Sequence, residues 1–225
     1  MNKRILIVAP HHDDECIGCG GLAAKMKAND WEIHAIFVFA PLESSKSVIL
    51  KRKKESAAAA ALLGIKLHPD IDIPCRVHVD TEDIAWKLVL LFRKIQPNIL
   101  LIPHAEERDP EHQAVHRAGI EASWLCSTPF HKHLGSPVPS PQVILGYEIW
   151  TPIKRPNLII DISSYLDLKL ASINCYDSQL KLTKLAHAAE GLAVYRGAMF
   201  GNCLAAEAFS VIKIHENIVL YEVTK

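Results

Sequence analysis

The feature that most constrains the fold is a short apolar run without polar alternation, Ile99-Leu100-Leu101-Ile102-Pro103. A strand of this kind is covered on both faces, as in a parallel sheet. Similar runs lie at 4–9, 32–39, 143–149 and 157–161, and helical patterns lie between or beside them at 17–29, 46–63, 81–95 and 110–124. This alternation predicts an α/β fold, a Rossmann-like and mostly parallel sheet with helices on both faces.

The second half of the chain is less regular. Helical patterns at 162–174 and 176–190 precede a glycine-containing loop at 195–202, and alternation at 209–215 and 218–223 predicts edge strands or a hairpin. The segment 128–142 is rich in Pro, Ser, His and Gly and is predicted to be a surface loop. With 225 residues and no linker-like stretch, a single domain over residues 1–225 is expected.

The charge and hydropathy of the chain limit the classes of partner that can be expected. Lys plus Arg and Asp plus Glu both number 25, so neither a nucleic-acid partner nor an anionic membrane surface is indicated. No apolar stretch approaches the roughly 20 residues of a membrane span, and the first residues do not resemble a secretory signal. A cytoplasmic protein is therefore expected. Cys16 and Cys19 form a C-x-x-C without a second pair, so packing in a helix is favoured over a redox or zinc site.

Five consecutive ionisable residues, His11-His12-Asp13-Asp14-Glu15, follow the first predicted strand. Because His11 and Asp14 are three residues apart, one tight turn can direct both at a common ion. Asp13 then points elsewhere and is free to hold a water molecule. Glu15 lies in the first helical turn, where helix capping and a functional role are both open. Gly18, Gly20 and Gly21 do not form a dinucleotide fingerprint, so they are interpreted as allowing close approach of helix and sheet.

A second polar cluster, 104–112, follows the strand predicted at 98–103. Asp109 is a suitable N-cap and Pro110 a suitable first-turn residue for a helix that carries His112. His11, Asp14 and His112 would give three metal ligands, and an open fourth position is the pattern of catalytic zinc. His104 is near enough to the strand end to line the pocket. His116 is four residues after His112, but the residue that follows His112 is Gln113 and not the glutamate that a helical metalloprotease motif requires there.

Together these clusters resemble the LmbE/PIG-L family of zinc-dependent de-N-acetylases. The family motifs A/P-H-P-D-D-E and D-x-H-P-D-H correspond here to Pro10-His11-His12-Asp13-Asp14-Glu15 and Glu107-Arg108-Asp109-Pro110-Glu111-His112. Further similarity lies in the helix with Arg52-Lys53-Lys54-Glu55, in Lys169 through Ser178-Gln179, and in Tyr195-Arg196-Gly197 through Glu207-Ala208-Phe209.

The resemblance implies that His11, Asp14 and His112 bind zinc and that Asp13 is the general base. It also implies that Arg52 helps to hold the sugar of an N-acetylated amino sugar or glycoconjugate, and that the protein can form homo-oligomers. Other divalent ions also accept such ligands.

Three positions depart from the family pattern. His12 replaces a proline and adds an imidazole near the metal, and Glu111 replaces an aspartate. Asp109 stands where many members have a histidine that stabilises the oxyanion or protonates the leaving amine. Three interpretations are open: Asp109 stays protonated and takes part in catalysis, His104 or His116 substitutes for that histidine, or activity is weak.

The function predicted from the sequence is metal-dependent hydrolysis of the N-acetyl or another N-acyl amide of an amino-sugar derivative, with zinc-activated water and Asp13 as base. One alternative is hydrolysis of a different amide, such as a sugar–thiol conjugate or an antibiotic intermediate. Another is a catalytically impaired protein that binds a sugar or a metal.

Overall fold

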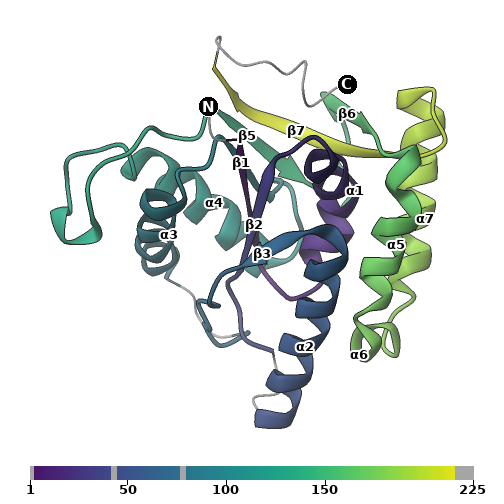
Figure 1. Ribbon diagram of the computed structural model, residues 1–225, viewed down its shortest axis with the longest axis horizontal. Coiled ribbons are helices and arrows are strands. Elements are labelled where there is room, and N and C mark those ends of the chain that lie inside the picture. Colours follow the sequence, from purple (N-terminus) through teal and green to yellow (C-terminus); the bar gives the residue numbers. More distant parts are fainter. Residues whose placement is uncertain (1–2, 42–44, 77–79, 216–225) are drawn as a thin grey trace.

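The fold is one seven-stranded sheet covered by helices on both faces (Figure 1). The computed structural model describes residues 3–41, 45–76 and 80–215. The strand order is β3-β2-β1-β4-β5-β7-β6, with β7 antiparallel to both of its neighbours and the other pairings parallel. The strands are β1 (Arg4–Ala9), β2 (Glu32–Phe37), β3 (Ile65–Leu67), β4 (Ile99–Pro103), β5 (Val143–Tyr147), β6 (Leu158–Asp161) and β7 (Ala206–Ile214). The predicted parallel α/β fold is confirmed.

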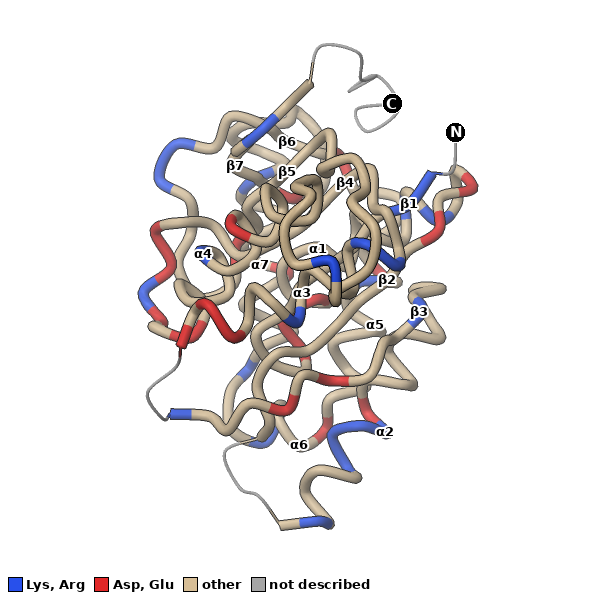
Figure 2. Tube along the Cα trace, turned by 90° about the vertical axis from the view of Figure 1, so that its left-hand side faces the viewer, with Lys and Arg blue, Asp and Glu red and all other residues tan. Residues whose placement is uncertain are grey.

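Two helices cover one face of the sheet, α3 (Thr81–Ile95) and α4 (Pro110–Leu125). The other face carries α1 (Asp14–Ala28), α2 (Lys46–Leu63), α5 (Leu166–Asn174) and α7 (Leu185–Arg196). Shorter helical segments are α6 (Asp177–Leu180), η1 (Lys132–Leu134), η2 (Ser163–Tyr165) and η3 (Gly197–Gly201). None of the helices in the described ranges is both long and apolar enough to cross a membrane. Acidic and basic residues are interspersed along the trace in Figure 2.

Each central strand supplies both hydrophobic cores. In β1, Ile5 and Ile7 belong to the core beneath α1, whereas Leu6 and Val8 belong to the core beneath α3 and α4. Successive side chains of a strand point to opposite faces, so a strand buried on both sides needs apolar residues throughout. This requirement accounts for the continuous apolar runs in β1 and β4.

Several sequence-based boundaries differ from the structure. Residues 209–214 belong to β7, which pairs with both β5 and β6, so the prediction of an edge strand was wrong there. Alternation of apolar and polar residues indicates which face of a strand is buried, but it does not give the order of the strands in the sheet. The edge next to β7 is formed by β6. The helix predicted over 176–190 is divided into α6 and α7. The predicted strand at 218–223 lies outside the described residues.

Two glycines of α1 allow this helix to pack closely against neighbouring residues of the core. A Cβ atom on Gly18 would lie 2.2 Å from Tyr147 Cδ2, and one on Gly21 would lie 2.6 Å from Ile162 Cδ1. Real Cβ atoms are not found so near their neighbours, so larger residues would push the helix away. The interpretation of Gly18 and Gly21 as close-approach positions is confirmed, whereas Gly20 has more room.

Candidate metal centre and active site

The two polar clusters meet at the carboxyl ends of β1 and β4, which are adjacent in the sheet. His11 Nδ1 lies 3.2 Å from Asp14 Oδ2 and 3.3 Å from His112 Nε2, and His112 Nε2 lies 3.5 Å from Asp14 Oδ2. Ligand atoms on a tetrahedral zinc at about 2.0–2.1 Å would be about 3.4 Å apart. The spacing of these three donor atoms therefore fits one zinc-sized ion.

A carboxylate lies behind each of the two imidazoles. His11 Nε2 is 2.8 Å from Glu111 Oε2, and His112 Nδ1 is 3.3 Å from Glu107 Oε2. A hydrogen bond to one ring nitrogen fixes the tautomer and leaves the other nitrogen with a free lone pair, as is usual for metal-binding histidines. The outer contacts thus leave His11 Nδ1 and His112 Nε2 as the metal-facing atoms.

The turn that carries the acidic residues has an unusual backbone. Asp13 has φ 120° and ψ −27°, a conformation that non-glycine residues rarely adopt. Its amide donates to Glu15 Oε2 at 3.1 Å, and Glu15 Oε1 accepts from the Tyr176 hydroxyl at 2.5 Å. The side chain of Glu15 therefore supports the Asp13 turn. Strain of this kind persists only where surrounding contacts hold it.

Asp13 lies beside the candidate ligands without belonging to the converging group. Its Oδ2 accepts a hydrogen bond of 3.0 Å from Gln179 Nε2, a contact between positions 166 residues apart that the sequence analysis missed. Burial raises the pKa of the Asp13 carboxyl well above its usual range, and the charges of Asp14 and Glu15 raise it further. A raised pKa makes this carboxylate a better proton acceptor.

The acidic surroundings also raise the pKa of the His11 imidazole. Burial opposes a charge on its ring, but hydrogen bonds involving Asp14, Cys75 and Glu111 raise its pKa well above the usual value. The site therefore favours positive charge.

Glu107 is a supporting residue that the sequence analysis did not single out. Its Oε1 accepts hydrogen bonds of 2.9–3.0 Å from three successive backbone amides, those of Ile149, Trp150 and Thr151. Burial opposes its charge, but hydrogen bonds with His104, His112 and backbone amides lower its pKa far below the usual range. Glu107 thus connects His112 to the loop after β5. Its only signal in the sequence was its place at the start of the second motif.

A pocket of about 490 Å³ opens beside the converging donors. Its walls include His11, Asp13, Asp14, Arg52, Arg76, Trp150 and Gln179. Arg52 Nη1 is buried without a hydrogen-bond partner among the described residues, and it lies 3.9 Å from Glu55 Oε2. Arg52 is therefore the wall residue with a spare buried donor, whereas the other predicted substrate-binding residue, His104, is not among those that line this pocket.

The side chain of Asp109 is occupied by contacts outside the converging group. Its oxygens accept hydrogen bonds of 3.0 and 2.8 Å from the Arg76 guanidinium, and Oδ1 also accepts from the Glu111 amide at 2.9 Å. The predicted N-cap role is confirmed. Burial opposes the charge of Asp109, but the Arg76 hydrogen bonds lower its pKa overall, which disfavours a protonated Asp109.

The remaining histidines of the two clusters point elsewhere. His104 Nε2 donates to Thr151 O at 2.7 Å, and His116 Nδ1 is 2.8 Å from Pro103 O. His12 borders the pocket, but its ring stacks on Phe37 and lies 2.7 Å from Ser56 Oγ, so it is engaged with β2 and α2. Neither His104 nor His116 lines the pocket in place of the missing histidine.

A second group of possible ligands, His11, Cys75 and Glu111, shares His11 with the first. In the described structure, Glu111 is already hydrogen-bonded to His11 Nε2, and the Cys75 thiol donates to Ala40 O at 2.6 Å. Cys16 and Cys19 belong to neither group and are buried in α1. The contacts thus favour the first group, in which the facing nitrogens of His11 and His112 lie close to each other and to Asp14 Oδ2.

Comparison with known proteins shows which family the sequence matches. The family model for GlcNAc-PI de-N-acetylase (PIG-L) matches residues 6–123, more than half of the chain. The diacetylchitobiose deacetylase of Thermococcus kodakarensis is 27% identical over 193 residues, which cover 79% of this chain and 70% of that protein.

Two solved structures share the whole fold. The conserved protein TT1542 from Thermus thermophilus superposes with a TM-score of 0.85 at 27% identity, covering 95% of this chain and 96% of that one. GalB, the 4-carboxy-2-hydroxymuconate hydratase of Pseudomonas putida KT2440, has a TM-score of 0.80 at 22% identity, with coverage of 96% and 100%. The likeness to GalB shows a common fold and nothing about the reaction.

Proposed function

Because the chain belongs to the GlcNAc-PI de-N-acetylase (PIG-L) family, we propose that it is a metal-dependent hydrolase that removes the acetyl group from an N-acetylated sugar or glycoconjugate. The relative from Thermococcus kodakarensis, a diacetylchitobiose deacetylase, supports this substrate class. The single observation that carries the proposal is the convergence of His11, Asp14 and His112 next to a buried carboxylate, Asp13, that is not one of the three.

His11 Nδ1, Asp14 and His112 Nε2 would hold the ion, and zinc suits two imidazoles and one carboxylate. A divalent ion held there would supply Lewis acidity and lower the pKa of bound water toward neutrality. Glu111 and Glu107 keep the two imidazoles in the ligating tautomer.

Asp13 is the proposed general base. It takes a proton from the water that attacks the amide carbonyl, and the same proton is then available for the nitrogen of the departing amine. The hydrogen bond from Gln179 orients one carboxylate oxygen and leaves the other for water. General acid–base catalysis of this type contributes roughly 10²–10⁴-fold in rate.

Arg52 and Arg76 are the proposed substrate-binding cations of the pocket wall. Arg52 offers Nη1, which has no hydrogen-bond partner among the described residues, to a sugar hydroxyl or carbonyl oxygen. Asp109 acts in this proposal by anchoring Arg76, because both of its oxygens already accept hydrogen bonds. It is not needed as an acid or base.

The test measures acetate release from a panel of N-acetylated sugars and non-sugar amides, together with metal content by elemental analysis. Asp13→Asn is expected to keep the metal and lose roughly 10²–10⁴-fold in kcat, whereas His112→Ala should lose the metal. Cys75→Ser should keep full metal content, since the second ligand group is not used.

Each alternative has a distinct result. Release only from non-sugar amides would point to a different amidase. Sugar or metal binding without any release would indicate an impaired binding protein. Unchanged turnover in Asp13→Asn would exclude Asp13 as the base.

A further inference from the structure

Helix α1, whose first turn carries Asp14, is broken in its first half. Cys19 has φ −146° and ψ 22°, far from helical values, so a short segment Asp14–Gly18 meets the rest of the helix at a kink. In an unbroken helix each amide donates to the carbonyl four residues earlier. A kink disturbs this ladder, and the affected groups need other partners when they are buried.

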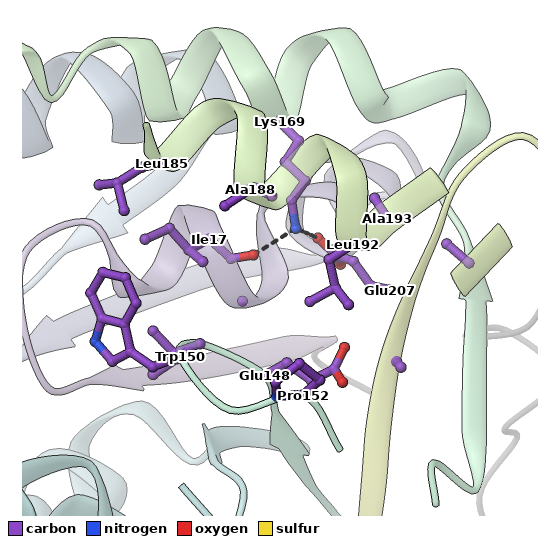
Figure 3. A pocket seen from close by; sticks show the side chains of 15 residues that line it. Ile17, Glu148, Trp150, Pro152, Lys169, Leu185, Ala188, Leu192, Ala193 and Glu207 are labelled. Carbon is purple, nitrogen blue, oxygen red and sulfur yellow. Dashed lines mark hydrogen bonds and ion pairs between the residues drawn. The ribbon is translucent and has the colours of Figure 1, made fainter. Parts of the chain in front are cut away.

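A buried ion pair from two distant elements contacts the helix at this kink (Figure 3). Lys169 Nζ, from α5, donates to Ile17 O at 2.7 Å. Glu207, from β7, accepts from the amide of Gly21 at 2.8 Å through Oε1 and from that of Leu22 at 2.7 Å through Oε2.

The pair takes the position of a backbone hydrogen bond. In a regular helix the Gly21 amide would donate to Ile17 O. Here the Gly21 amide meets Glu207, Ile17 O meets Lys169, and Lys169 Nζ lies 2.5 Å from Glu207 Oε1. The ion pair thus bridges the broken step from one segment of α1 to the other.

Both charged side chains are only 3% exposed. Burying an ion pair is costly, and an apolar pair of similar volume is often as stable or more so. Stability alone therefore does not explain charged residues here. What the charges provide is direction, because an ammonium group and a carboxylate fix the orientation of the backbone groups that they contact.

We propose that Lys169 and Glu207 are positioning residues for the metal centre: by joining the two segments of α1, they set the angle of the turn that presents Asp13 and Asp14. Neither residue lines the pocket beside the converging donors. Ile17, whose carbonyl oxygen accepts from Lys169 Nζ, is only three residues beyond Asp14. A rotation of the segment Asp14–Gly18 would therefore move the Asp14 carboxylate. This inference rests on the function proposed above.

The experiment measures Zn²⁺ affinity of the metal-free protein by competition with a chromophoric chelator, and the visible spectrum of the Co²⁺-loaded protein. The variants are Lys169→Met and Glu207→Gln. The matched control is Arg93→Met, which removes a buried cation that also donates to backbone carbonyls, including Gly135 O at 2.7 Å and Thr128 O at 3.0 Å. Arg93 lies in α3, on the opposite face of the sheet from α1.

All three variants are expected to unfold at a lower temperature than wild type. Only Lys169→Met and Glu207→Gln should weaken Zn²⁺ binding, by about tenfold, the lower end of the range for groups that contact a ligand directly, and shift the Co²⁺ bands. Glu207→Gln keeps an acceptor for a helix amide, so it provides the measurement if Lys169→Met does not fold.

The inference is overturned if both variants bind Zn²⁺ as tightly as wild type and lose stability only as Arg93→Met does. Failure of the wild-type protein to bind Zn²⁺ would instead refute the proposed metal centre itself. The two failures are therefore distinguishable.

Discussion

Glu107→Gln should weaken metal binding although Glu107 is not a proposed ligand. Its Oε1 accepts three backbone amides, and its Oε2 lies 3.3 Å from His112 Nδ1. A glutamine amide oxygen can keep the three backbone contacts, so the loop 149–151 should stay in place. The amide nitrogen then faces His112 Nδ1, which sets one donor against another.

The size of the effect follows from the role of the contact. His112 would lose the acceptor that keeps its proton on Nδ1 and its lone pair on Nε2. Changes of this type at metal sites weaken affinity by about 10–100-fold, which corresponds to about 1.4–2.7 kcal/mol. Loss of charge-assisted hydrogen bonds should also lower the free energy of unfolding by about 1–3 kcal/mol.

Zn²⁺ affinity of the metal-free protein, measured by chelator competition at constant pH, provides the assay. Glu106→Gln is the matched control, because Glu106 has the same charge and is its immediate neighbour but is exposed. The control should bind Zn²⁺ as wild type does. If Glu107→Gln also binds within about twofold of wild type, the assigned tautomer and the supporting role of Glu107 are wrong.

Three further outcomes are expected. Gly18→Ala should destabilise the protein by about 1–3 kcal/mol through overpacking, whereas Gly191→Ala, with open space around its Cβ position, should be neutral or stabilising by up to about 1 kcal/mol; equal urea midpoints would contradict this. Asp109→Asn keeps a good N-cap but loosens Arg76, so KM for the sugar should rise with little change in Tm; an unchanged KM would remove Arg76 from substrate binding. Because the folded-state pKa of Glu107 is depressed, its stabilisation is present above an unfolded pKa of about 4.3 and is lost as pH falls. Urea midpoints of wild type should therefore fall more steeply below about pH 4 than those of Glu107→Gln, and parallel curves would argue against a buried carboxylate.

The parts of the site that were predictable depend on local signals. Continuous apolar runs mark buried strands, and polar clusters at their carboxyl ends meet where strands are neighbours, which brought His11, Asp14 and His112 together. The cap at Asp109 also followed from its position before Pro110. These inferences need only the alternation of side chains along a strand, the preference for certain residues at a helix N-terminus, and the rule that ligands bind at the carboxyl ends of parallel strands.

The remaining contacts depend on tertiary structure. Gln179 reaches Asp13 across 166 positions and Glu207 reaches Gly21 across 186. Arg76, which lies beyond β3, contacts Asp109 and Glu111 at the start of α4, 33 and 35 positions away. No periodicity encodes such pairs, so the sequence indicated a pocket without indicating what supports it.

The distribution of charges around the site favours a bound cation. Several carboxylates near the candidate centre are 5% exposed or less, namely Asp13, Asp14, Glu15, Glu107, Glu111 and Glu207. The carboxylates of the four glutamates in this set form hydrogen bonds or ion pairs with backbone amides, a tyrosine hydroxyl, histidines, Arg76 or Lys169. Within the described residues, neither Asp13 nor Asp14 forms an ion pair with Lys or Arg.

Two buried carboxylates without a strong cation are costly, and such a site takes up either protons or a metal ion. The raised pKa values of Asp13 and His11 correspond to the uptake of protons. A divalent ion on Asp14 and the two histidines would replace those protons, so binding should stabilise the fold by about 2.7 kcal/mol at a free metal concentration about 100 times Kd. Thermal unfolding of the metal-free protein with and without Zn²⁺ measures this gain. It should disappear in Asp14→Asn, and an equal rise of Tm in that variant would show that zinc binds elsewhere.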